Sequence, residues 1–334
     1  MKQTIIVIFT IAISIVLLSC NKEEKTFSLI ATTEKCINDK TLLERHYDDN
    51  GNEYFDIKWE IGDGIRIYSI SGDLGAVYED YYYVHSISQD GRTAYFLNSL
   101  DGNEILNVSD INPIAFYPPI LETYGGEYLS EEDSYYMYTG NPIFFLNPGQ
   151  SYSETNVIRG FPMASLVNED LSNRNHLHLS FYNICGLLRI KIKDGRDSIT
   201  RVKKVRISSS NNISGYFGFR FPYEYSLPEA LELESVEGTF HFGGGYEGYE
   251  RFISGTNYIE LTCSNANNGT GVPLASDGTD FYFYVPPTMM NDMVIEVTNM
   301  DDEVATKDLS GHNIQVMRSQ LTGIKVDFTN VPFI

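Results

Sequence analysis

The chain has 334 residues, of which 42% are hydrophobic and 13% aromatic, so it holds enough apolar material for a globular core. It carries 24 Lys and Arg against 45 Asp and Glu, and the resulting net charge of -21 argues against binding to nucleic acid or to an anionic membrane face. The 24 Tyr, 19 Phe and 27 Gly beside a single Trp favour β-sheet with many tight turns, and the length predicts two domains.

The chain begins with the features of a secreted lipoprotein. An apolar run follows Lys2 and is shorter than the roughly 20 residues needed to cross a hydrocarbon core. It ends in Leu17-Leu18-Ser19-Cys20, in which a small residue precedes a cysteine. We therefore expect a lipoprotein signal peptide over residues 1–19 and acylation of Cys20, for example by palmitate. The alternative is an ordinary anchor helix with an incidental cysteine.

A charged linker over residues 20–26 follows the signal peptide. Lys22 is succeeded by Glu23 and Glu24, and no Asp follows Cys20, so the usual cue for retention in the inner membrane is missing. The stretch resembles the export signal of lipoproteins in the bacterial group that carries fimbrillins. This resemblance implies a lipid-anchored protein exposed on the outer face of the cell outer membrane. The alternative is a solvated linker that happens to be charged.

Short segments of alternating apolar and polar residues dominate the rest of the chain. Residues 188–193 and 324–329 place apolar side chains on one face, as half-buried antiparallel strands do. Other strands are expected at 27–33, 65–70, 81–87, 94–97, 111–117, 135–145, 177–182, 202–208, 258–263, 281–285 and 294–298, and a helical turn is expected at 229–234. Dipeptides such as Asp90-Gly91 suit hairpin turns, and many short strands at this spacing predict sandwiches.

A polar, turn-rich stretch at residues 168–175 separates two sets of strands. We therefore expect an all-β chain with an N-terminal antiparallel β-sandwich over residues 27–170 and a C-terminal one over residues 171–334. The only tryptophan, Trp59, lies just before the turn Gly62-Asp63-Gly64, and we expect its side chain in the core of the first domain.

Catalytic chemistry has no positive support in the sequence. No nucleophile elbow, phosphate-binding loop or metalloprotease motif appears, so we expect no enzyme activity, no cofactor and no metal. Cys36, Cys185 and Cys263 remain beside Cys20, an odd number without the spacing of a disulfide framework or a zinc site. His176 and His178 would share one face of a strand, but a third ligand is not near in sequence, and a solvent-facing pair is the simpler interpretation.

Clusters of tyrosine offer a surface for recognition. They contain Tyr78, Tyr81, Tyr82 and Tyr83, and later Tyr135, Tyr136 and Tyr138. Strand alternation must expose some of these rings, and rigid amphipathic rings suit adhesion or stacking on glycans. The alternative is that tyrosine is simply a good strand residue.

Motifs spread over nearly the whole chain after the signal peptide resemble the fimbrillin family. They are Phe27–Thr33, Lys40-Thr41-Leu42, Ile57–Tyr68 around Trp59, Ile114–Pro119, Leu179–Ile190 and Phe281–Pro287, in the family's order. The chain has Tyr182-Asn183 where relatives often carry a histidine. The resemblance implies two tandem transthyretin-like β-sandwich domains in a subunit of type V pili, assembled by strand exchange with other fimbrial subunits.

The resemblance also implies activation by proteolysis. In polymerising members, an arginine-specific protease cuts in the loop behind the first strand, and a donor strand from another subunit fills the groove. Arg45 is the candidate here, and an ordinary exposed loop arginine is the alternative. Only residues 329–334 follow the last strong alternation, so we expect a tip or accessory adhesin of the fimbrium, with a host or bacterial receptor, rather than a stalk subunit. A monomeric surface lipoprotein that binds glycans for uptake is the alternative function.

Overall fold

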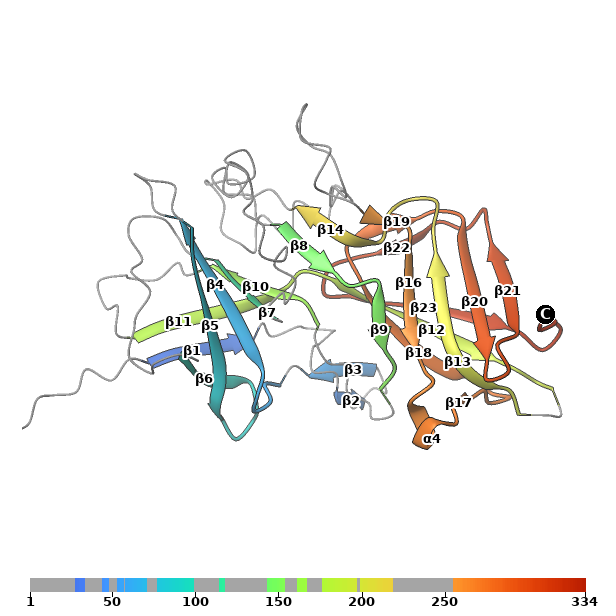
Figure 1. The fold of residues 1–334 in the computed structure, drawn as a ribbon, viewed down its shortest axis with the longest axis horizontal. Coiled ribbons are helices and arrows are strands. Elements are labelled where there is room, and N and C mark those ends of the chain that lie inside the picture. The colour runs from blue at the N-terminus through green and yellow to red at the C-terminus, as the bar shows by residue number, and fades with distance from the viewer. Residues whose placement is uncertain are drawn as a thin grey trace, which may run out of the picture.

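The computed structural model describes residues 28–33, 44–47, 53–56, 58–70, 77–98, 114–117, 143–153, 161–166, 176–196, 199–218 and 255–334 (Figure 1). These residues form β-strands almost throughout, and the only helical element among them is the single turn α4 (Ala266–Gly269). The all-β expectation is therefore confirmed for the described part of the chain.

The N-terminal unit is a closed barrel, drawn on the left of Figure 1. Around the barrel the strands run β1 (Ser28–Thr33), β11 (His176–Asn183), β10 (Met163–Leu166), β7 (Ile114–Tyr117), β4 (Gly64–Ile70), β5 (Val77–Ile87) and β6 (Thr93–Asn98), and β6 pairs again with β1. Alternate side chains of these strands fill the interior. Leu29, Ile65, Tyr82, Phe96 and Phe181 are each 1% exposed or less.

Trp59 lies at the centre of the barrel core and is 3% exposed, so its predicted core position is confirmed. Its ring meets Phe96, Tyr117 and Phe181 edge to face, at centroid distances of 5.2, 5.3 and 5.4 Å. Edge-to-face contacts of this kind add about 0.5–1.5 kcal/mol each beyond burial. The segment around Trp59 therefore organises the barrel from within.

The C-terminal unit packs two sheets face to face. One sheet has the order β18 (Thr279–Val285), β12 (Gly186–Lys193) and β23 (Leu321–Asp327). The other has the order β21 (Val304–Leu309), β20 (Met293–Asn299), β13 (Arg201–Ser208), β16 (Tyr258–Thr262) and β9 (Gly149–Ser151), with β17 (Val272–Pro273) pairing β13. Buried side chains of both sheets form one core cluster, which makes this unit a two-layer sandwich.

Alternation explains how the strands of the sandwich are oriented. In β12, Leu188, Ile190 and Ile192 are buried, whereas the cationic side chains between them face outward. The remaining pairings are β14 (Ser214–Gly218) with both β8 (Ile143–Leu146) and β15 (Gly255–Thr256), β19 (Thr288–Met290) with β22 (Ile314–Val316), and β2 (Glu44–Tyr47) with β3 (Glu53–Asp56).

Three features differ from the predicted pair of antiparallel sandwiches. The first unit is a closed barrel, because β1 pairs with strands on both of its edges. Three strand pairs, β1–β11, β12–β23 and β16–β9, are parallel. Sheet pairing runs across residue 170, since β11 belongs to the barrel whereas β8 and β9 pair with strands of the C-terminal unit. The chain crosses between the units more than once, and its last crossing, at Ile184-Cys185, is a buried apolar connection that composition does not mark.

Several predicted features lie outside the described residues. They are the signal peptide, Cys20, the export signal Lys22-Glu23-Glu24, Cys36, the helical turn at 229–234 and the tyrosines at 135, 136 and 138. In the part of the chain that the structure describes, no helix is long and apolar enough to cross a membrane.

Candidate functional site

The seam of the barrel is the strand β1. It runs parallel to β11, with Ala31 opposite Leu179, and antiparallel to β6, with Ala31 opposite Ala94. Leu29 and Ala31 are 0% exposed and point into the core. Without β1, the edges of β6 and β11 would lose their hydrogen-bonding partner, and the core would open along an apolar groove.

A strand of six residues with two buried apolar side chains contributes modestly to stability. Full burial of a Leu side chain is worth about 1.5–3 kcal/mol, and an Ala side chain contributes less. The rest of the attachment is backbone pairing on both edges, which any extended segment can supply. The geometry of the seam therefore permits replacement of β1 by another strand with apolar residues at alternate positions.

Arg45 lies in the strand β2, not in the loop that the sequence suggested. β2 pairs with β3 antiparallel, and Arg45 is opposite Phe55. The alternation in each of these segments spans only four residues, which is too short to stand out from the surrounding polar sequence. Arg45 follows β1 in the chain, so hydrolysis of the bond after Arg45 would leave β1 attached to the barrel by pairing alone.

The strands β2 and β3 form a two-stranded ribbon that carries Arg45. The structure pairs these two strands only with each other among the described residues. An isolated two-stranded ribbon is marginally stable at best, and its free edges can pair with an extended binding cleft. The position of Arg45 in this ribbon is therefore compatible with cleavage after brief local opening.

The turn after Trp59 ties the strands of the barrel together. The Asp63 carboxylate accepts hydrogen bonds from the backbone N–H of Glu60 at 2.8 Å and from the Tyr117 hydroxyl at 3.0 Å. Backbone bonds from Trp59 N–H to the Gly91 carbonyl and from Val84 N–H to the Asp63 carbonyl link the turn to β5 and its hairpin. These bonds link the turn to β5, to β7 and to the hairpin between β5 and β6, and none of them involves β1.

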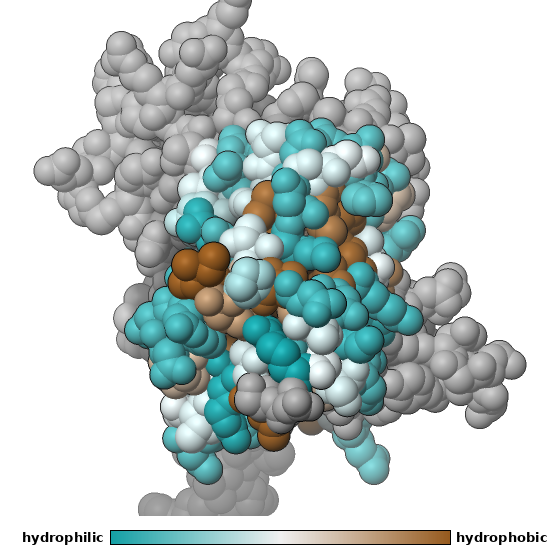
Figure 2. Space-filling model, turned by 90° about the vertical axis from the view of Figure 1, so that its right-hand side faces the viewer, coloured by the Kyte–Doolittle hydropathy of each residue, from teal (hydrophilic) through white to brown (hydrophobic). Residues whose placement is uncertain are grey.

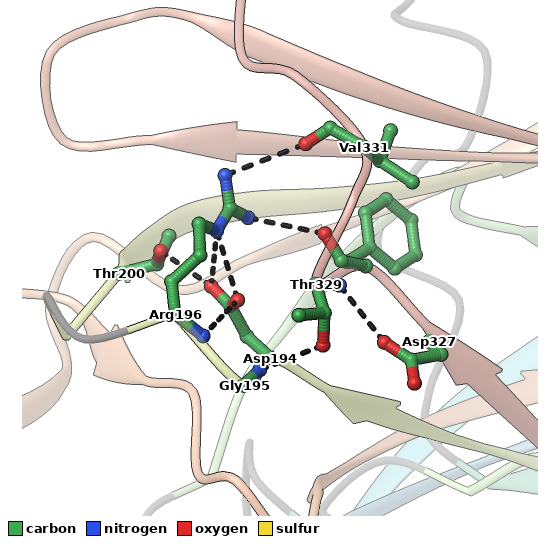
Figure 3. A network of polar contacts seen from close by, with 8 residues as sticks. Asp194, Gly195, Arg196, Thr200, Asp327, Thr329 and Val331 are labelled. Carbon is green, nitrogen blue, oxygen red and sulfur yellow. Dashed lines mark hydrogen bonds and ion pairs between the residues drawn. The ribbon is translucent and has the colours of Figure 1, made fainter.

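The sandwich holds the end of the chain through a polar clamp, shown in Figure 3. Arg196 Nε donates to both oxygens of Asp194, at 2.8 and 3.1 Å, and the guanidinium also donates to the carbonyls of Phe328 and Val331 at 3.4 Å. The guanidinium carbon lies 4.7 Å from the centre of the Phe333 ring. Asp194 and Arg196 thereby fasten the segment 328–333 onto the sandwich.

The clamp depends on an ionised carboxylate at Asp194. The Asp194 side chain is 2% exposed and also accepts a hydrogen bond from the Thr200 hydroxyl at 2.6 Å. Burial raises the pKa of Asp194, but hydrogen bonds from Arg196 and Thr200 outweigh burial and hold the pKa below its ordinary value of 3.8. The carboxylate is therefore charged at neutral pH and keeps Arg196 oriented.

The fastened segment covers one side of the sandwich, where β23 and β21 are edge strands. Ile334 exchanges backbone hydrogen bonds with Val304 of β21, at 2.9 and 3.1 Å, and Val331 and Phe333 pack against the core. Figure 2 faces the C-terminal end of the molecule and shows apolar side chains surrounded by hydrophilic ones. The segment 328–334 is therefore engaged with its own sandwich.

Gln150 closes a gap near the other edge strands, β9 and β18. It belongs to β9, is 4% exposed, and bonds both backbone groups of Tyr284 in β18. Its side-chain nitrogen donates to the Tyr284 carbonyl at 2.9 Å, and its oxygen accepts from the Tyr284 N–H at 3.2 Å. One amide side chain thus replaces a neighbouring strand at this edge and joins the two sheets.

The described residues do not show a constellation for catalysis or metal binding. They contain no group of three or more His, Cys, Asp or Glu side chains placed to hold a metal. Cys185 and Cys263 are free and buried, and burial raises the pKa of Cys263 to about 12 and that of Cys185 still higher. Neither thiol is available as a nucleophile in the folded state.

Comparisons with solved structures give distant likenesses over most of the chain. A proposed cell adhesion protein from Bacteroides ovatus is 11% identical, with a TM-score of 0.47, over 92% of this chain and 94% of that chain. A proposed cell adhesion protein from Bacteroides uniformis is 16% identical, with a TM-score of 0.42, over 93% and 97%. The tip fimbrial protein Mfa3 from Porphyromonas gingivalis is 10% identical, with a TM-score of 0.33, over 92% and 97%.

These solved structures belong to the class of proteins, fimbrial and adhesive, that the sequence motifs also resemble. No family model and no curated protein matches the chain.

Proposed function

We propose that this chain is a fimbrial subunit of the strand-exchange type, displayed on the cell surface through a lipid on Cys20. The observation that carries the proposal is the seam strand β1, which closes the barrel by backbone pairing on both edges and buries only Leu29 and Ala31 among its described side chains. The bond after Arg45 is the activating cleavage site, because its hydrolysis separates β1 from the rest of the barrel. Surface export depends on Lys22, Glu23 and Glu24.

Within a fimbrium, the role of a tip or accessory adhesin fits the chain better than that of a stalk subunit. A subunit that donates a strand must present a free extended segment. Here the segment 328–334 is fastened by Arg196 and by pairing with Val304, so it is not free to leave without breaking the clamp. We therefore propose that the chain accepts a strand at the barrel seam while the segment 328–334 stays on its own sandwich.

Strand exchange is tested with the chain's own first strand as the probe. Purified protein is treated briefly with trypsin, and a fluorescent peptide of residues 27–33 is then added, with capture followed by polarisation. We expect cutting after Arg45 and slow capture of the peptide, because the labelled strand fits the vacated groove. A peptide with Asp in place of Leu29 and Ala31 is the matched control, since it keeps the backbone but cannot bury charges in the core.

Arg45→Ala should abolish both cleavage at this bond and capture of the peptide. If the clipped protein captures the peptide no better than the Asp-substituted control, strand exchange at the seam is refuted. A monomeric surface lipoprotein that binds glycans then becomes the better interpretation.

Surface display is tested separately from strand exchange. Cys20→Ala should release the protein from membranes, whereas Lys22, Glu23 and Glu24 changed together to Ala should leave it acylated but hidden from external protease on intact cells. A triple variant that external protease still removes from cells would refute the export role of these residues.

A further inference from the structure

The single turn α4 departs from right-handed helical geometry. Asn267 has φ 49° and ψ 50°, Asn268 has φ 58° and ψ 39°, and Gly269 has φ 85°. Three successive residues therefore lie in the left-handed region, which Asn and Gly normally visit as single residues. We call Asn267, Asn268 and Gly269 the left-handed turn. It lies between β16 and β17 in the chain, at the lower edge of the sandwich in Figure 1.

Hydrogen bonds and close packing hold the two ends of the left-handed turn. The N–H groups of Thr270 and Gly271 both donate to the Ala266 carbonyl at 3.1 Å. The Asn267 side-chain amide donates to the Gly271 carbonyl at 3.0 Å. Gly271 packs against β13, because a Cβ at this position would lie 2.6 Å from the Val202 carbonyl oxygen. The unusual backbone conformation is therefore imposed on a short turn whose two ends are fixed.

Asn268 is the asparagine of this turn whose side chain is not held. It is exposed, and its amide makes no hydrogen bond with the described residues, in contrast to the amide of Asn267. Gly269 follows it and has no Cβ, so the next main-chain nitrogen is not shielded by a side chain. Among the described asparagines, Asn268 alone precedes a glycine, and the other such pair, Asn50-Gly51, lies outside the described residues.

An exposed asparagine followed by glycine can react with its own main chain. The Gly269 nitrogen attacks the Cγ atom of Asn268, the new C–N bond closes a ring, and the Cγ–Nδ2 bond breaks. Ammonia leaves with the proton of the attacking N–H. An attacking group held next to its target avoids the entropic cost of a bimolecular encounter, so this reaction needs no catalyst.

Water then opens the ring at one of two bonds. Cleavage of the bond between Cγ and the Gly269 nitrogen leaves an aspartate with an ordinary peptide bond. Cleavage of the bond between the main-chain carbonyl carbon and this nitrogen leaves an isoaspartate, in which the main chain runs through the former side chain. Nothing is oxidised or reduced, and water is the only co-reactant.

We propose that Asn268 is a site of spontaneous deamidation in the folded protein. The attack requires the backbone to rotate at Asn268, and opening of a single exposed turn allows this rotation without unfolding a sheet. The neighbouring Asn267 is a poorer substrate, because its amide is bound to Gly271 and the residue after it has a side chain. The reaction converts the neutral left-handed turn into one that carries a negative charge.

The structural consequence of the isoaspartate is local. It adds one main-chain atom inside the turn, across which the N–H groups of Thr270 and Gly271 bond to Ala266. These two bonds should weaken, whereas β17 keeps its pairing with β13 beyond the turn. The modified protein should therefore keep its fold and change only the shape and the charge of the turn.

Peptide mapping of the full chain by mass spectrometry tests the proposal. Folded protein is incubated in mildly alkaline buffer, which speeds the attack because the Gly269 nitrogen must lose its proton, and it is then digested at mildly acidic pH. We expect the amide-to-acid mass change at Asn268 to be at least about tenfold faster than at any other described asparagine, or about 1.4 kcal/mol lower in barrier. Fragment ions separate Asn268 from Asn265 and Asn267, which are the internal controls.

The products show whether the ring is formed. Attack by the main chain should give first a species lighter by one ammonia and then two products of equal mass, aspartate and isoaspartate, that separate by chromatography. Direct hydrolysis of the side-chain amide would give aspartate alone, and this result would overturn the proposed reaction.

Two variants test the role of the dipeptide. Asn268→Gln keeps an amide but needs a ring one atom larger, and Gly269→Ala keeps Asn268 but shields the attacking nitrogen. Both should slow the mass change at residue 268 at least about tenfold. Asn265→Gln is the matched control, because it alters an exposed amide of the same turn that makes no capping bond, and Asn268 should convert in it as in the unchanged chain.

An unchanged thermal midpoint shows that each variant is folded, and Asn268→Gln keeps the test decisive if Gly269→Ala is not. Conversion of Asn268 no faster than that of Asn265 or Asn267 refutes the proposal. So does a synthetic peptide of residues 263–271 that converts while Asn268 in the folded chain does not, because the fold would then protect this amide.

Discussion

The barrel and the sandwich solve the problem of unpaired strand edges in different ways. The barrel has no edge, because β1 pairs on both sides and closes the sheet. The sandwich keeps edge strands and covers them with side chains and a short segment: Gln150 on β18, and the segment 328–334 beside β21 and β23. Closure by a strand can be undone and restored with another strand, whereas closure by particular side chains cannot.

This difference assigns separate roles to the two units. The barrel is closed by β1, and the ribbon of β2 and β3 that carries Arg45 follows β1 in the chain. The sandwich is closed by contacts specific to its own residues, such as the ion pair of Arg196 with Asp194. Under the proposed strand exchange, the barrel is the unit that would open, and the sandwich is the unit that would stay folded.

The largest expected effect is on the free energy of unfolding of the barrel, and it tests whether the cores of the two units unfold separately. Trp59→Ala should destabilise the barrel by about 3–5 kcal/mol, because it empties the centre of an edge-to-face aromatic cluster. Cys185 and Cys263 lie in the sandwich core and should stay protected from thiol reagents, as read by mass spectrometry at each cysteine. Trp59→Phe is the milder control. Exposure of both thiols together with loss of the barrel would show that the units unfold as one.

Disruption of the clamp should have the next largest effect on the free energy of unfolding, and this effect should be confined to the sandwich. Arg196→Ala removes hydrogen bonds to a buried carboxylate and to two carbonyls, and we expect a loss of about 1–3 kcal/mol in the free energy of unfolding. Arg201→Ala is the matched control, since the Arg201 side chain is exposed and bonds Thr270 and Gly271 among the described residues, and its loss should cost less than about 0.5 kcal/mol.

The contribution of the clamp should also depend on pH. The folded pKa of Asp194 is lowered, so its stabilisation is present above the ordinary value of 3.8 and is lost as the pH falls through the folded pKa. The difference in unfolding free energy between the unchanged chain and Arg196→Ala should therefore narrow below about pH 4. A difference that stays constant down to pH 2 would mean that the ion pair is not the source of the clamp's stability.

Removal of the Gln150 amide should lower the free energy of unfolding by as much as Arg196→Ala does, or by less. Gln150→Leu keeps the volume but leaves the N–H and carbonyl of Tyr284 without their bonds, at a cost of about 1–3 kcal/mol. Ionised Glu in Gln150→Glu accepts from the Tyr284 N–H but cannot donate to the Tyr284 carbonyl, whereas the protonated acid can do both. We therefore expect Gln150→Glu to be destabilised at neutral pH and to approach the unchanged chain at acidic pH. The stability of both variants is measured by chemical denaturation, with protection of Cys263 from thiol reagents as the readout. Unchanged stability in Gln150→Leu would show that the edge of β18 does not need this cap.

Much of the secondary structure could be predicted from the sequence, because alternation over six to eight residues is a local signal. The strands β12, β13, β18 and β20 are close to their predicted ranges, and Trp59 is in the core as expected. The short strands β2, β9, β19 and β22 were missed, since three or four residues do not establish a period.

Long-range features of the site could not be read in the same way. Alternation shows that Leu29 and Ala31 share a face but not that β1 lies between β6 and β11, which turns a sandwich into a barrel. The clamp joins Asp194 and Arg196 to residues more than 130 positions away, a pairing without a local motif. Alternation also marks Tyr95 as outward without showing whether another segment covers it.

The smallest expected effect on stability comes from substituting one glycine in a turn of each unit. Gly62 precedes β4 of the barrel with φ +97°, Gly311 follows β21 of the sandwich with φ +87°, and an added Cβ would meet nothing within 4 Å at either position. The substitutions Gly62→Ala and Gly311→Ala therefore introduce backbone strain alone, worth about 1 kcal/mol each. Asn tolerates this conformation better, so Gly62→Asn and Gly311→Asn should cost less. If the units are independent, Gly62→Ala lowers only the midpoint of the unfolding transition followed by Trp59 fluorescence. Gly311→Ala then lowers only the midpoint of the transition followed by protection of Cys263. Equal shifts of both transitions by either variant would show instead that closure of the barrel and closure of the sandwich form one cooperative unit.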